Sequence, residues 1–248
     1  MVRAITFDAF GTIIDERRDV LIRIAREICK AHRPTLRPDA LLATWDRYLY
    51  SGADSEPFKT LSELTQESLG KAFRDERIEA DPRPYVESLE SRWRQAKAYP
   101  EVPRVLKVLD GVPRAIVSDA DHAFLEGILR RNHLRFDAVI TSESVRAYKR
   151  RPQIFQAALI ALRTSPEDVV HIGDSLNEDV AGASRLGIHT IWVNRGGIHR
   201  TAADPKPDAE VRDLAGLPGM IEQVLDRASP TPENPGERQL RLSAYRVK

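Results

Sequence analysis

The chain has 248 residues and carries 38 Lys and Arg against 37 Asp and Glu, a formal net charge of +1. This balance argues against a surface dedicated to nucleic acid, because neutralising phosphates needs a clear basic excess. With 42% hydrophobic and 30% charged residues, the composition is that of a globular protein and excludes disorder throughout.

Apolar runs and cysteine content narrow the class further. No apolar run approaches the roughly 20 residues of a membrane helix, and the first residues lack the apolar stretch of a secretory signal. The sequence therefore predicts a cytoplasmic protein that does not bind membranes. Cys29 is the single cysteine, which excludes an internal disulfide and a thiolate zinc site. Any metal must have oxygen or imidazole ligands.

Short apolar segments that end in polar residues predict the strands of a buried sheet. They are residues 2–7, 114–117, 138–140, 169–172 and 189–193, and helical patterns at 102–109, 123–131, 152–162 and 178–186 alternate with them. This alternation is typical of a parallel sheet with right-handed crossovers, whose polar strand ends meet in one crevice. We therefore expect a Rossmann-like α/β fold, a three-layer α/β/α sandwich.

Residues 15–98 interrupt that alternation with apolar residues at helical spacing. The pattern predicts an inserted α-helical cap domain at 15–98, placed over the crevice of a core made of residues 1–14 and 99–227. Residues 228–248 are rich in proline and predict a flexible tail. The aromatic residues of the cap are expected to pack in its interior. They are Trp45, Tyr48, Phe58 and Trp93.

Polar residues at the predicted strand ends could carry chemistry. Asp8, Ser118 and Asp174 end strands, and Lys149 lies in a neighbouring connection. A carboxylate that ends an apolar strand is costly to bury alone, so Asp8 should meet a cation or a metal. Asp174 and Asp179 stand five residues apart and can join Asp8 around a hard cation, for which magnesium is the natural choice.

Each of these residues, taken alone, would also fit a purely structural role. Asp179 could be an acid in the first turn of a helix, Ser118 an N-cap, and Lys149 a solvated surface lysine. Their joint occurrence at strand ends favours a functional site.

Four motifs follow one another along residues 2–200. They are Phe7-Asp8-Ala9-Phe10-Gly11-Thr12, Val117-Ser118-Asp119, the stretch from Lys149 to Phe155, and Ile172-Gly173-Asp174-Ser175 through Asp179. In their order and residues they resemble the haloacid dehalogenase (HAD) superfamily of hydrolases, in the subfamily with a helical cap inserted after the first motif.

The resemblance implies a role for each motif residue. Asp8 would be the nucleophile that forms an aspartyl intermediate, which water then hydrolyses. Thr12 and Ser118 would hydrogen-bond the transferred group, and Lys149 would balance the charge of the nucleophile. The residues expected to contact the substrate are Phe10, Gly11 and Asp119. Mg²⁺ would be held by Asp8, the backbone carbonyl of Phe10, Asp174 and Asp179.

The first motif departs from the phosphatases of this superfamily, which have an acid/base aspartate where this chain has Phe10. A phenyl ring cannot transfer a proton, so an alkoxide would leave about 10²–10⁴-fold more slowly. The dehalogenase branch carries an aromatic residue there and expels halide, which needs no proton.

The fourth motif points the other way, because dehalogenases have serine and asparagine where this chain has Asp174 and Asp179. Two further dehalogenase residues are missing as well. Phe155 replaces a tyrosine and Asp46 replaces an arginine.

Three hypotheses remain. The first is magnesium-dependent hydrolysis of a small phosphorylated metabolite, with a good leaving group or with an acid supplied by Asp119, Asp121, His122 or a cap residue. The second is a metal-independent, 2-haloacid dehalogenase-like attack on carbon. The third is a non-catalytic HAD-fold binding protein. The first is favoured among the three, and the intact nucleophile, lysine and metal-binding acids favour chemistry over pure binding. The expected partner is a small anionic molecule, with the chain a monomer or homodimer.

Overall fold

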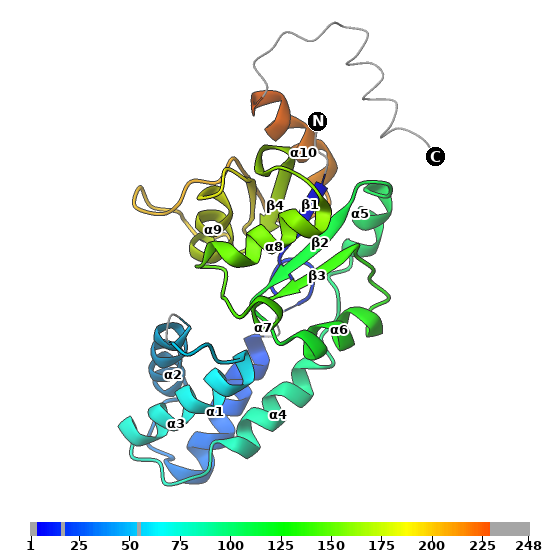
Figure 1. The fold of residues 1–248 in the computed structure, drawn as a ribbon. Coiled ribbons are helices and arrows are strands. Elements are labelled where there is room, and N and C mark those ends of the chain that lie inside the picture. The colour runs from blue at the N-terminus through cyan, green and yellow to red at the C-terminus, as the bar shows by residue number, and fades with distance from the viewer. Residues whose placement is uncertain (1–3, 16–17, 54–55, 229–248) are drawn as a thin grey trace, which may run out of the picture.

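The structure, a computed structural model, describes residues 4–15, 18–53 and 56–228. Its centre is a six-stranded parallel sheet in the order β3-β2-β1-β4-β5-β6 (Figure 1). The strands are β1 (Ala4–Phe7), β2 (Arg114–Ser118), β3 (Ala138–Thr141), β4 (Val169–Gly173), β5 (His189–Val193) and β6 (Ala209–Val211). The five predicted strands are confirmed, apart from residues 2 and 3, which lie outside the described residues. β6 was not predicted, because three residues give no readable alternation.

Alternate residues of the strands face two separate apolar cores. Ile5 and Phe7 pack with α5 (Val102–Val108), α6 (His122–Arg131) and α10 (Leu217–Ala228) on one face. Ala4 and Val169 pack with α8 (Pro152–Leu162) and α9 (Ala181–Ser184) on the other. The predicted three-layer α/β/α fold is therefore confirmed. Two short elements, α7 (Ser142–Val145) and a 3₁₀ turn at Pro166–Asp168, complete this part of the chain.

The helix predicted at 178–186 is present, but it starts as a π-helical turn and ends at Ser184. Residues Leu176–Val180 form a π-helical turn, and only Ala181–Ser184 are α-helical. The backbone N–H of Val180 donates to the Ser175 carbonyl five residues earlier, at 3.1 Å. The wider turn brings the Asp179 carboxylate back onto the Ser175 N–H, at 2.9 Å. A π turn that reorients a side chain in this way is frequent at functional sites.

Four helices occupy the described part of the interrupting segment, as its apolar spacing predicts. They are α1 (Arg18–His32), α2 (Pro38–Gly52), α3 (Leu61–Asp75) and α4 (Arg83–Trp93). They pack around a cluster of their own that includes Trp45, with Tyr48 and Trp93 at its margin. The group lies beside the edge of the sheet where β3 runs into α7 (Figure 1).

Phe58 does not join that cluster, contrary to the expectation. A capping box at Thr60 starts α3 at Leu61, which leaves Phe58 in the preceding connection. Its ring centre lies 5.5 Å from that of Tyr148 instead.

The connections into and out of the helical group pair with each other. Asp15 N–H donates to the Lys97 carbonyl at 2.9 Å, and Tyr99 N–H donates to the Ile13 carbonyl at 3.1 Å. The chain thus enters and leaves the helical group at neighbouring positions. Of the predicted tail, only Ala228, which ends α10, is described. Among the described residues, no helix has the length and apolar character to cross a membrane.

Candidate active site

Three of the predicted site residues share one edge of the sheet. Asp8 follows β1, Ser118 ends β2 and Asp174 follows β4. Because β1 pairs with β2 on one side and with β4 on the other, their polar ends are neighbours. The backbone N–H of Asp8 donates to the Ile172 carbonyl at 2.8 Å, which ties Asp8 to the strand that leads into Asp174.

Lys149 lies between α7 and α8 and joins two carboxylates. Its Nζ donates to Asp8 Oδ1 and, at 2.7 Å, to Asp179 Oδ1, and all three side chains are buried. Burial lowers the pKa of Lys149, but the two carboxylates more than offset it, so the pKa stands well above its ordinary value. The ammonium therefore stays charged between the two acids.

The two acids differ in their electrostatics. Burial raises the pKa of Asp8 to about 7, against the opposing effect of Lys149. Burial acts the same way on Asp179, but Lys149 and His171 outweigh it and hold its pKa below the ordinary value. Of the two acids, Asp179 is therefore the one whose ionised form is stabilised by its neighbours. A further cation beside Asp8 would favour its ionised form.

One side of Asp8 is open to such a cation. Its Oδ2 is buried and accepts no hydrogen bond from any residue in the described ranges. Carboxylate oxygens of Asp8, Asp174 and Asp179 lie within 4.8 Å of one another. A carboxylate with one donor-free buried oxygen, grouped with two further carboxylates, fits a hard divalent cation such as Mg²⁺. These three acids are therefore of the chemistry that such a cation takes.

The turn after β1 is shaped around that cluster. Gly11 has φ +82°, and a Cβ there would lie 2.3 Å from Asp174 Oδ2, so only glycine allows the two to approach. The Thr12 hydroxyl is buried and has no hydrogen-bond partner within the described part of the chain. It is therefore available to a bound group.

Phe10 lies in an aromatic wall beside this turn. Its ring centre is 6.3 Å from that of Phe124 on α6, and the Arg94 guanidinium lies 4.9 Å over the Phe124 ring. Position 10 is thus held by apolar contacts.

The two acids after β2 accept hydrogen bonds from different parts of the chain. Asp119 Oδ1 accepts from the backbone N–H of Lys149 at 2.8 Å, and burial raises the pKa of Asp119 to about 7. Asp121 accepts from the N–H groups of Leu61 and Ser62, at 2.7 and 3.0 Å, and so caps the start of α3. Of the acids that could replace the missing one at position 10, Asp121 is already committed to this contact.

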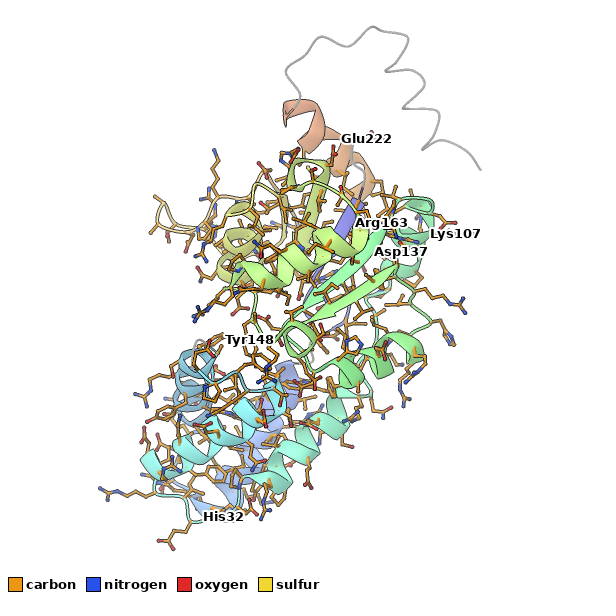
Figure 2. The ribbon with its side chains drawn as sticks, viewed as in Figure 1. His32, Lys107, Asp137, Tyr148, Arg163 and Glu222 are labelled. Atoms are coloured by element: carbon orange, nitrogen blue, oxygen red, sulfur yellow. The ribbon has the colours of Figure 1, made fainter. Side chains whose placement is uncertain are left out.

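The helical group also contacts the segment that carries Lys149. The Tyr148 hydroxyl donates to the Lys59 carbonyl at 3.0 Å, and Arg146 lies 5.2 Å over the ring of Phe58. Figure 2 shows Tyr148 where the helical group meets the rest of the molecule. The connection into α3 therefore lies against the residue next to Lys149.

Two residues that support the site were not predicted. Arg195, after β5, donates to the carbonyls of Gly11 and Thr12 at 3.1 and 2.8 Å, and pairs with Glu101 at 2.7 Å. It thereby clamps the turn after β1. His171 lies inside β4, with Nε2 3.0 Å from Asp179 Oδ1. The one sequence signal that could have identified His171 is that a histidine interrupts an otherwise apolar strand.

The chain is similar to known proteins over most of its length. A model of haloacid dehalogenase-like hydrolases matches residues 2–187. The chain is 29% identical to (S)-2-haloacid dehalogenase 4A of Burkholderia cepacia over 203 residues, 79% of this chain and 84% of that protein. It is 30% identical to a phosphoserine phosphatase of Thermus thermophilus over 186 residues, 71% of this chain and 72% of that protein. Its fold is similar to that of L-2-haloacid dehalogenase from Xanthobacter autotrophicus, with a TM-score of 0.72 at 21% identity over 90% of this chain and 99% of that one.

Proposed function

This chain belongs to the haloacid dehalogenase-like hydrolases, and on that premise we propose that it hydrolyses a small phosphorylated metabolite with Asp8 as nucleophile and Mg²⁺ as cofactor. The observation that carries the proposal is the different surroundings of the two Asp8 carboxylate oxygens. One oxygen is paired with Lys149, and the other is buried without a donor among the described residues, in a carboxylate that lies close to those of Asp174 and Asp179. Such a carboxylate is held in place yet keeps a free oxygen for chemistry or for a metal.

The reaction has two steps. An oxygen of Asp8 attacks phosphorus, so that an Asp–O–P bond forms while the bond from phosphorus to the leaving oxygen breaks with its electron pair. Water then attacks phosphorus and releases phosphate and the free carboxylate. Lys149 offsets the negative charge of Asp8 as the anionic group approaches. The hydroxyls of Thr12 and Ser118 would donate to its oxygens, next to Gly11 and Asp119.

Asp8, Asp174 and the Phe10 carbonyl would hold the magnesium ion. The oxygens of Asp179 already accept from Lys149, His171 and the Ser175 N–H, so this acid would contribute through water. When bound, the ion supplies charge neutralisation for the nucleophile and the phosphoryl oxygens together.

Residues 15–98 are proposed as a cap over the site, between core segments 1–14 and 99–227. Contacts from the helical group reach Asp121 and Tyr148, which lie within three residues of Ser118 and Lys149 along the chain. A cap in this place would exclude water and line the substrate pocket.

A specific observation favours a second candidate, a metal-independent attack on carbon. Phe10 and Phe124 present aromatic surface where a proton donor would serve a phosphatase. One of the relatives is an (S)-2-haloacid dehalogenase, whose name gives a 2-haloacid as its substrate. Halide leaves without a proton.

A substrate panel separates the two candidates. Phosphate esters, acyl phosphates and 2-haloacids are assayed with added magnesium and with chelator, and free phosphate and halide are both measured. We expect phosphate release that requires magnesium. Halide release that is indifferent to the chelator would replace this proposal with the second candidate.

Gly11→Ala tests the metal ligands directly. The new Cβ would displace the Asp174 carboxylate, so we expect magnesium binding by calorimetry to weaken about tenfold or more. Gly111→Ala is the matched control, because Gly111 has φ +87° but open space around its missing Cβ. Both variants should lose about 1–2 kcal/mol of unfolding free energy from the backbone alone. Equal magnesium affinity in the two variants would contradict Asp174 as a ligand.

A further inference from the structure

His171 is the centre of a buried chain of polar contacts. Its Nδ1 lies 2.9 Å from Thr6 Oγ1 on β1, and its Nε2 lies 3.0 Å from Asp179 Oδ1. Thr6, His171 and Asp179 are each about 1% exposed. The edge of Phe155 packs against the imidazole, with ring centres 4.9 Å apart. The ring is therefore fixed by three neighbours, away from water.

The partners of the ring determine where its proton lies. An ionised carboxylate only accepts, so the nitrogen that faces Asp179 must carry the hydrogen. The other nitrogen of a neutral imidazole is an acceptor, and the Thr6 hydroxyl can donate to it.

Asp179 is in turn shared between His171 and Lys149. Its Oδ1 accepts from both His171 Nε2 and Lys149 Nζ, while Oδ2 accepts from the Ser175 N–H. Lys149 is itself shared with Asp8. The orientation of Asp179 therefore determines whether the Lys149 ammonium can donate to Asp8 and Asp179 at the same time.

We propose that His171 is a positioning residue, held between Asp179 and Thr6 as the Nε2–H tautomer, which fixes Asp179 so that Lys149 keeps its bridge to Asp8. His171 acts through Asp179 and does not touch the substrate. Its effect on turnover rests on the proposed function, whereas its tautomer does not.

The tautomer is read by long-range ¹H–¹⁵N correlation on protein labelled with ¹⁵N-histidine. The chain has six histidines, and His171→Gln identifies the signals of His171 by their loss. We expect at neutral pH a protonated Nε2 and a bare Nδ1. A proton on Nδ1 overturns the proposal, whatever the enzyme hydrolyses.

The kinetic arm uses p-nitrophenyl phosphate with magnesium. We expect His171→Leu to lower kcat about tenfold or more with KM unchanged, since residues that orient an active-site carboxylate by a hydrogen bond have effects of about 10–100-fold. His171→Gln keeps an N–H donor toward Asp179 and should recover most of the loss.

His189→Leu is the control. His189 lies 3.8 Å from Asp208, away from Lys149, and its loss should leave kcat unchanged. A His171→Leu enzyme as fast as the wild type, or a His171→Gln enzyme as slow as His171→Leu, overturns the proposal. If the wild type does not release phosphate, the proposed function fails and the spectrum alone decides on His171.

Discussion

Asp8→Asn is expected to abolish turnover, with a loss of about 10⁴-fold or more, as for other catalytic nucleophiles. The amide is nearly isosteric with the carboxylate but is too weak a nucleophile to form the aspartyl intermediate. Lys149 keeps its 2.7 Å contact with Asp179 in this variant, so its charge stays paired. The measurement is the initial rate on the best substrate of the panel, with magnesium present.

The control separates lost chemistry from lost structure. Asp110→Asn changes a carboxylate that is 84% exposed and should keep the full rate. Urea unfolding should place Asp8→Asn within about 2 kcal/mol of the wild type, the usual range for a conservative change. A folded Asp8→Asn enzyme with a rate within tenfold of the wild type would exclude Asp8 as nucleophile.

Oxygen-18 water shows at which atom the intermediate is hydrolysed. In phosphoryl transfer, water attacks phosphorus, so the label enters phosphate and Asp8 keeps its own oxygens. In the second candidate, an ester between Asp8 and carbon is hydrolysed at the carbonyl carbon, so the label enters Asp8. Mass spectrometry of the tryptic peptide 4–17, which contains Asp8, distinguishes the two outcomes.

The sheet and the helices could be predicted because their signals are local. Buried parallel strands are short apolar runs, and Ala4–Phe7 and Val169–Gly173 both show this pattern. The helices α1 to α4 repeat apolar residues at helical spacing and appear where that spacing predicts them. The π turn at Leu176–Val180 could not be predicted, since it depends on where the Asp179 carboxylate turns after folding.

Only those residues of the candidate site that stand at strand ends or in the ordered motifs could be predicted. Asp8 and Ser118 follow from the rule that polar ends of parallel strands converge. Arg195 and His171 do not, because the contacts that tie them to β1 and the turn after it join residues 165 or more positions apart. Position along the chain carries no signal for such contacts. An arginine after a strand can equally face solvent, and a histidine inside a strand can equally be a core residue with an ordinary hydrogen bond.

Phe10→Asp is expected to raise the turnover of alkyl phosphates. A positioned general acid typically contributes about 10²–10⁴-fold, which is the upper bound of the expected gain. A gain of about tenfold or more would show that the new carboxyl acts as the acid. Position 10 follows the nucleophile by two residues and faces the ring of Phe124, and a carboxyl there would protonate the leaving alkoxide. The rate on p-nitrophenyl phosphate should change far less, because its leaving group needs no proton. The ratio of the two rates is therefore the measurement.

Phe10→Asn is the matched variant for this experiment, since the amide has the size of the acid but transfers no proton. Both variants lose the contact with Phe124, whose centre is 6.3 Å from that of Phe10, and should be destabilised alike by about 1–3 kcal/mol. A higher ratio in Phe10→Asp alone would show that the site is complete for phosphoryl transfer except for this one acid. Equal ratios in both variants would mean that the aromatic wall serves a leaving group that needs no proton, and would shift the balance to attack on carbon.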